Sequence, residues 1–117
     1  MIYKIWVDGI PKGPNFMSRK HWTVQNAHKK EWQEKIGWLA KVKKPKQPFE
    51  KARIHFAIKT GDTKKRDPDN LNWAITKPSL DALKGIFITD DSLDNVQLSY
   101  EYSQEKPKGF EIQIEEI

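Results

Sequence analysis

The segment RDPDNLNWAITKPSLDALKGIFITDDS, residues 66–92, decides how the fold of this chain is interpreted. It follows a run of alternating apolar and polar residues at 52–60, which predicts a strand. Residues 68–84 have a helical pattern, and Pro78 is expected to kink or split that helix. The short apolar run 86–88 predicts a brief strand. We therefore expect a strand–helix–strand unit, whose helical crossover allows its two strands to pair in parallel.

The remaining sequence adds one helix and several strands. Patterning predicts strands at 2–8, at 95–102 and from Gly109 onward, a loop at 9–21, a helix at 23–40 with Thr23 as its N-cap, and a basic linker at 41–51. The fold class is therefore α/β (α+β), a single domain over residues 1–117. We expect a mixed β-sheet of about five strands with two helices packed on it, in the order β-α-β-α-β-β-β. The last two strands are close enough in sequence to form a hairpin.

Charge is distributed unevenly along the chain. Residues 11–66 hold 16 Lys or Arg against 4 Asp or Glu, a net charge of +12, whereas residues 67–117 hold 4 against 11, a net charge of −7. Such asymmetry indicates a basic surface for phosphates beside an acidic region, although a solvated surface without a partner is the plainer alternative. A basic-aromatic cluster forms where the loop meets the following helix, from Arg19, Lys20, His21 and Trp22. Trp22 either stacks on a base or wedges at a distorted duplex, or it is buried as a core residue.

Composition excludes several classes of protein. The chain has no cysteine, which excludes disulfides, thiolate zinc sites and a cysteine nucleophile. It has no glycine-rich phosphate loop, GxSxG elbow or HExxH motif. Its N-terminus lacks the apolar run of a signal peptide, and no segment approaches the roughly 18 apolar residues of a membrane span. We expect neither a membrane association nor a small-molecule cofactor.

Four carboxylates flank the predicted helix. Asp67 and Asp69 stand at its start, and Asp90 and Asp91 follow the short apolar run. Each pair has an ordinary explanation, since Asp caps helices and is common in turns. If the two flanking strands end at the same sheet edge, however, the pairs converge. Their repulsion would then favour a hard cation such as Mg²⁺ among them.

Basic residues within and beside this segment allow two interpretations each. Lys77, inside the predicted helix, either neutralises charge that develops on a phosphate during cleavage or is a solvated helix lysine. Lys65 and Arg66 either clamp DNA phosphates or compensate the acidic helix start.

Taken together, these motifs resemble those of the RusA-like Holliday-junction resolvases, which are bacterial and phage-borne crossover junction endodeoxyribonucleases. The matching elements are RDPDNL at 66–71, Lys77 four residues before Asp81-Ala82-Leu83, and the second acid of the Asp-Asp pair at Asp91. In the family the lysine follows DNL almost at once, whereas residues 72–76 intervene here and Trp73 occupies the uninserted position.

The resemblance implies a homodimer that places paired symmetric nicks in a four-way DNA junction, using Mg²⁺ with Mn²⁺ as a substitute. It also implies action in the cytoplasm of a bacterial or phage-infected cell, in association with the nucleoid. Together with the basic loop, it implies the following site: metal ligands Asp67, Asp69 and Asp91, with Asp90 as the alternative second acid; Lys77 assisting catalysis; and DNA contacts from Lys65, Arg66, Asn70, Arg19, Lys20 and His21.

Two other classes stay open at this point. One is a non-catalytic protein that binds branched DNA and keeps the fold, its lysine displaced by the inserted turn. The other is a small-molecule hydrolase that uses the acids as general acid and base. The second class does not account for the net charge of +12 in residues 11–66.

Overall fold

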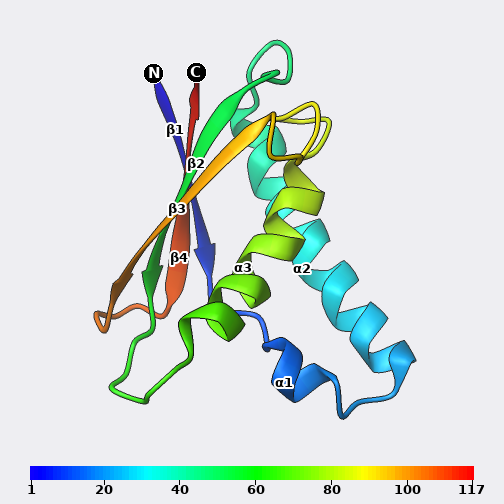
Figure 1. The fold of residues 1–117 in the computed structure, drawn as a ribbon, viewed down its shortest axis with the longest axis vertical. Helices are drawn as coiled ribbons and strands as arrows, with labels where there is room; N and C mark the ends of the chain where they lie inside the picture. The colour runs from blue at the N-terminus through cyan, green and yellow to red at the C-terminus, as the bar shows by residue number, and fades with distance from the viewer.

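A computed structural model describes all 117 residues, and it consists of one four-stranded sheet with helices on one face (Figure 1). The elements in chain order are β1 (Ile2–Asp8), α1 (Pro14–Met17), α2 (Trp22–Lys43), β2 (Ala52–Lys59), α3 (Pro68–Leu83), β3 (Val96–Ser103) and β4 (Gly109–Glu116). The predicted α+β class and mixed sheet are confirmed. The sheet has four strands rather than about five, and a third, short helix lies in the loop predicted at 9–21.

The strand order is β1-β4-β2-β3, with β2 parallel to β3 and β4 antiparallel to both β1 and β2. The predicted hairpin between the last two strands is therefore wrong, because β2 lies between them. Burial explains the order. Phe110, Ile112 and Ile114 of β4 are fully buried in a central strand, whereas Leu98 and Tyr102 of β3 remain 40% and 49% exposed at the edge.

The strand predicted at 86–88 is instead a turn that closes the end of α3. The amides of Ile86, Phe87 and Ile88 all donate to the carbonyl oxygen of Leu83. Only isolated bridges, to Phe49 and Lys84, involve this segment. Phe87 and Ile88 are buried in the core, which accounts for the apolar run. The prediction failed because a short buried turn has the same composition as a short buried strand.

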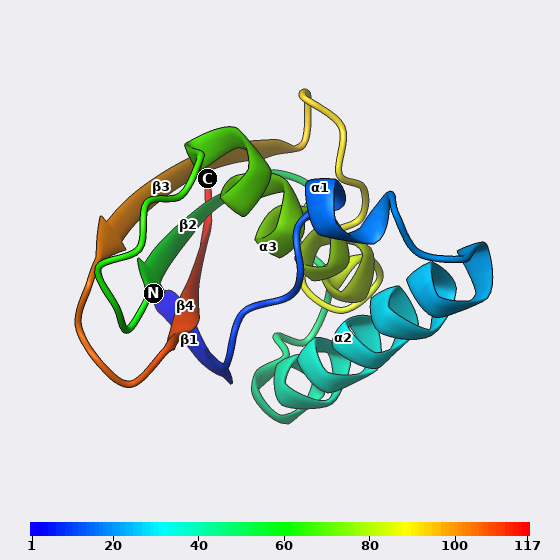
Figure 2. The same ribbon diagram turned by 90° about the horizontal axis from the view of Figure 1, so that it is seen from below.

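α3 packs on the sheet through its buried face, and α2 packs against both α3 and β1 (Figure 2). Seven of the sixteen residues of α3 are buried, whereas in the longer α2 only Ile36 and Ala40 are. Pro78 lies inside α3 without splitting it. α2 begins at Trp22, one residue before the predicted N-cap, because the Nδ1 atom of His21 accepts from the amide of Thr23 at 3.2 Å. None of the helices combines the length and apolar character needed to cross a membrane.

Candidate functional site

The first turn of α3 presents two carboxylates. Asp67 is the N-cap residue, yet its side chain makes no capping hydrogen bond. Asp69 follows in the first turn, and its Oδ1 accepts from the amide of Asn70 at 2.9 Å. Both side chains are exposed. The helix dipole favours negative charge here, so the carboxylates are placed where they are stable as anions.

The turn before α3 is braced by an ion pair that the sequence analysis did not single out. Arg66 donates from Nη1 and Nη2 to the two carboxylate oxygens of Asp62, at 2.7 and 3.0 Å. The hydrogen bond from Arg66 holds the pKa of Asp62 well below its usual range, and the same bond raises the pKa of Arg66. The spacing of four residues is the only sequence signal for this pair. Much of the charge of Arg66, predicted to contact DNA, is therefore neutralised within the turn.

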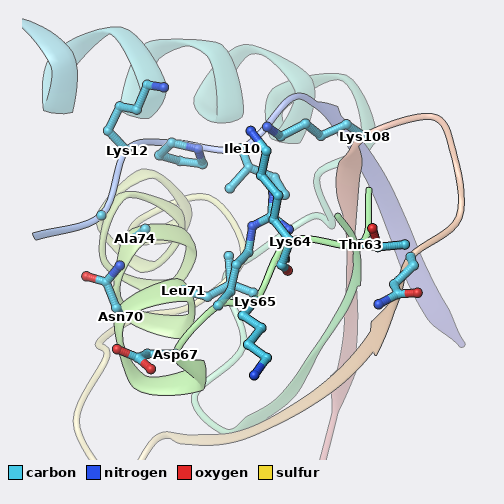
Figure 3. Close-up of a pocket in the computed structure, with 14 residues that line it drawn as sticks. Ile10, Lys12, Thr63, Lys64, Lys65, Asp67, Asn70, Leu71, Ala74 and Lys108 are labelled. Carbon is cyan, nitrogen blue, oxygen red and sulfur yellow. Dashed lines mark hydrogen bonds between the residues drawn. The ribbon is translucent and has the colours of Figure 1, made fainter. Parts of the chain in front are cut away.

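A cleft of about 830 Å³ opens beside this turn (Figure 3). Its lining comes from three separate stretches of chain: residues 10–13, residues 63–74, and Gln104 with Lys108. The lining includes Lys12, Lys64, Lys65 and Lys108, none of which makes an ion pair, and Asp67 is its only acidic residue. Of these lysines, the sequence analysis identified only Lys65 as a site residue. Hereafter we call this feature the lysine cleft.

The N-terminal loop is docked on the first turn of α3 through Asn70. The amide of Asn15 donates to Oδ1 of Asn70 at 3.3 Å. Gly13 lies so close that a Cβ atom there would stand 2.4 Å from Nδ2 of Asn70. The amide of Lys12 also donates to Nε2 of His28 in α2, at 3.0 Å. Asn70, predicted to contact DNA, therefore fixes the wall of the lysine cleft that carries Lys12.

The predicted basic-aromatic cluster lies between α1 and α2 and does not line the lysine cleft. Arg19, Lys20 and His21 are all exposed, and the ammonium of Lys20 lies 4.9 Å from the ring centre of Phe16. Trp22 is 65% exposed, so its burial as a core residue is wrong. The cluster is an exposed surface at the start of α2, available to a partner but separate from Asp67.

Asp90 and Asp91 lie at the opposite end of α3. Nζ of Lys84, the C-cap residue, is 3.4 Å from Oδ1 of Asp91. Desolvation raises the pKa of Asp91, but the positive charge of Lys84 beside it outweighs this effect and holds the pKa below its usual value. Oδ1 of Asp90 accepts from the amide of Asp91 at 2.9 Å.

The predicted convergence of the two acidic pairs is therefore wrong within one chain. α3 has 16 residues, which corresponds to about 24 Å between its ends. Asp67 follows the carboxyl end of β2, and Asp91 precedes the amino end of β3. Because β2 and β3 are parallel, these two strand ends lie at opposite ends of the sheet (Figure 1). No group of three or more His, Asp or Glu side chains is gathered to hold a metal ion.

Lys77 is also remote from the first turn. It stands ten residues after Asp67 on the same helix, about 15 Å along the axis. Its Nζ lies 3.2 Å from Oδ1 of Asp81, a pair within α3 that is completed by Gln33, whose Nε2 donates to Oδ2 of Asp81 at 3.0 Å. In its own chain Lys77 cannot act on a phosphate held beside Asp67.

Comparison with known proteins adds a decisive match. The model of a family described as Endodeoxyribonuclease RusA matches residues 10–115 of the 117. The chain belongs to the RusA family. A search of curated proteins finds no relative that matches the chain. The resemblance inferred from the motifs is thus confirmed. Membership of the RusA family implies an endodeoxyribonuclease that acts on branched DNA and resolves Holliday junctions.

Proposed function

We propose that this RusA-family protein is a Mg²⁺-dependent endonuclease that resolves four-way DNA junctions by paired symmetric nicks, acting as a homodimer. The observation that carries the proposal is the first turn of α3, where the uncapped carboxylate of Asp67 borders the lysine cleft. Carboxylate oxygens suit a hard cation, and lysines beside them suit the flanking phosphates of a DNA strand. We place this action in the cytoplasm of a bacterial or phage-infected cell, at the nucleoid.

The residues of one chain fit such a cation only in part. Asp67 and Asp69 supply two carboxylates at one end of α3, while Asp91 lies at its other end, about 24 Å away. Mg²⁺ can be held by one or two carboxylates together with water and phosphate oxygens, so the pair supplies part of such a site. The three-carboxylate ligand set implied by the resemblance is incomplete in a single chain.

A two-fold symmetric dimer would complete the set. If the symmetry axis passes beside the middle of α3, perpendicular to the helix, the two copies of this helix run antiparallel, and the start of each lies beside the end of the other. Asp91 of a second copy would then approach Asp67 and Asp69, and symmetry would create two equal sites. Trp73, 55% exposed on α3, and Leu98 and Tyr102 at the sheet edge beside it offer apolar surface for such a contact.

A bound Mg²⁺ would lower the pKa of a water molecule and withdraw charge from the scissile phosphate. The chain itself would supply the rest of the chemistry. Asp67 and Asp69 would hold the cation, Lys65 would contact the strand being cut, and Arg19, Lys20 and His21 would contact the arms of the junction. A catalytic role for Lys77 stays a prediction, and it would require phosphate brought to the middle of α3 rather than to its first turn.

The direct test uses a synthetic four-way junction labelled on opposed strands. We expect symmetric nicks in Mg²⁺ or Mn²⁺ and none in chelator, and Asp67→Asn should abolish them. Asp94→Asn is the matched control, because Asp94 is an exposed acid in the loop after α3 with no ion pair. Tight binding of the junction without nicks in either metal would instead support the non-catalytic alternative, which the remote position of Lys77 favours.

A mixing experiment tests the shared site. Asp69→Asn and Asp91→Asn proteins, each inactive alone, are mixed and allowed to exchange subunits. If sites form between copies, each mixed dimer holds one site with both substitutions and one intact site. Roughly half of the dimers are mixed after exchange, so nicks in one strand of the junction should return in that fraction. If each site forms within one chain, every site carries a substitution and no nicking returns. Mn²⁺ binding should recover in the same way.

A further inference from the structure

The lysine cleft continues beyond Asp67, and none of the roles above explains its far side. Lys12, Lys64 and Lys108 line it without any carboxylate partner, and Arg66, also in the lining, is already paired with Asp62. Like charges gathered around one hollow repel each other, and this repulsion is relieved when an anion occupies the hollow. The charge pattern therefore points to an anionic occupant.

The position of Lys108 is fixed by two turns from elsewhere in the chain. The amide of Gly9, at the end of β1, donates to the carbonyl oxygen of Lys108 at 3.0 Å. Gly61, after β2, has a φ of +74°, and a Cβ atom there would lie 3.0 Å from Cβ of Lys108. Glycine adopts positive φ without strain and lets another backbone approach closely. Three chain segments thus meet to hold Lys108 at the wall of the lysine cleft.

The lining also indicates which anion fits. Only three of its fourteen residues are hydrophobic, so the cleft lacks the apolar walls that usually bury a drug-sized ligand. Thr63, Asn70 and Gln104 add neutral polar groups among the lysines. An open basic groove with polar walls is typical of surfaces that follow a sugar-phosphate backbone.

We propose that the lysine cleft binds the backbone phosphates of a DNA strand next to the phosphate that is cut, with Lys12, Lys64 and Lys108 as the contacts. Asp67 stands on α3 at one side of the cleft, and Lys108 comes from the sheet side (Figure 3). A strand that reaches Asp67 through the cleft would therefore have its neighbouring phosphates at these lysines. The assignment of neighbouring phosphates rests on the proposed function; the binding of DNA in the cleft does not.

The test compares Lys108→Ala with Lys106→Ala. Lys106 belongs to the same loop and is exposed, but it does not line the cleft. Affinity for a four-way junction is measured without divalent metal over a range of salt concentrations. Each phosphate contact contributes a slope of about −0.9 to log K against log salt, so Lys108→Ala should flatten the slope by about one contact. Lys106→Ala should leave it unchanged, and Lys64→Ala should repeat the effect of Lys108→Ala.

Equal slopes for Lys108→Ala and Lys106→Ala, with both proteins folded by circular dichroism, would overturn the inference. Failure of the proposed function would look different, because the junction would not be nicked while the slope difference between the two variants persisted. Mn²⁺ binding separates the two sites further. Lys108→Ala should retain Mn²⁺ binding, whereas Asp69→Asn should lose Mn²⁺ binding and keep the salt slope of the unmodified protein.

Discussion

The two ends of α3 carry nearly the same residue types in different surroundings. Each end has two aspartates with a lysine close by in sequence. At the start of the helix, Asp67 makes no side-chain capping bond and borders a cleft with four unpaired lysines. At the end, Asp91 is held by Lys84 at 3.4 Å. The difference teaches that the neighbours of a carboxylate, rather than the carboxylate itself, decide whether it is available to a ligand.

Backbone direction adds to this contrast. The start of α3 follows the carboxyl end of a parallel strand, where sites in open α/β sheets usually lie, and the end of α3 precedes the amino end of the next strand. We therefore expect substitutions at the start of the helix to change DNA cleavage and binding. Substitutions at the end should act on cleavage only through Asp91.

The largest effect is expected from Asp69→Asn, which removes one of the two carboxylates from the first turn. Substitution of residues that only orient the ligands of a metal ion costs about 10- to 100-fold, so loss of a direct ligand should reduce the nicking rate by more than about 100-fold. Single-turnover cleavage of a labelled junction measures the rate. Retention of full activity would show that the start of α3 is not the metal-binding end.

Gly13→Ala should disturb the start of α3 without changing any charge. A Cβ atom at this position would stand 2.4 Å from Nδ2 of Asn70, so the side chain of Asn70 must move and the N-terminal loop must shift with it. Because the obstacle is the end of a side chain, we expect a loss of about 1 kcal/mol, at the low end for overpacking. Denaturant unfolding measures it. Gly37→Ala is the control, since a Cβ atom there meets nothing within 4 Å.

Asp62→Asn should change how stability depends on pH. The pKa of Asp62 is lowered by its bond to Arg66, so its contribution to stability is present above its ordinary pKa of 3.8 and is lost as pH falls through the lower folded value. The melting temperature of the unmodified protein should exceed that of Asp62→Asn at pH 7. This difference should shrink on acidification below about pH 4. A difference that does not depend on pH would contradict the assignment.

The smallest effect is expected at the other end of the helix, from Lys84→Ala. The side chains of the Lys84–Asp91 pair are 44% and 27% exposed, and surface pairs of this kind contribute less than about 1 kcal/mol. Chemical denaturation at pH 7 should detect little change. A loss of several kcal/mol would mean that this end is held as tightly as the core.

Much of the fold could be predicted from residue patterns. Alternation located all four strands, because β1, β2 and β4 each bury one face more than the other, and the edge strand β3 keeps the alternating pattern although only Val96 is buried. The same reasoning failed at Ile86–Ile88, since three buried apolar residues look alike in a turn and in a strand. It also failed for the hairpin, because closeness in sequence does not show that β2 will lie between β3 and β4.

For the site, the sequence identified Asp67, Asp69 and Lys65 as neighbours, because they share one turn of chain. It could not identify Lys12 and Lys108. Lys12 lies in the loop after β1, which His28 and Asn70 hold in place, and Lys108 lies in the loop before β4, which Gly9 and Gly61 contact. Contacts of this kind depend on how the strands are ordered, and they leave no local pattern.

The sequence by itself determined the family and the types and order of most of the elements, because local periodicity and a short run of motif residues carry that information. Only the tertiary structure decided that the two acidic pairs lie apart within one chain. A continuous helix between parallel strands carries the chain from the carboxyl end of β2 back to the amino end of β3, so Asp67 and Asp91 are separated within a chain however close their motifs stand in sequence.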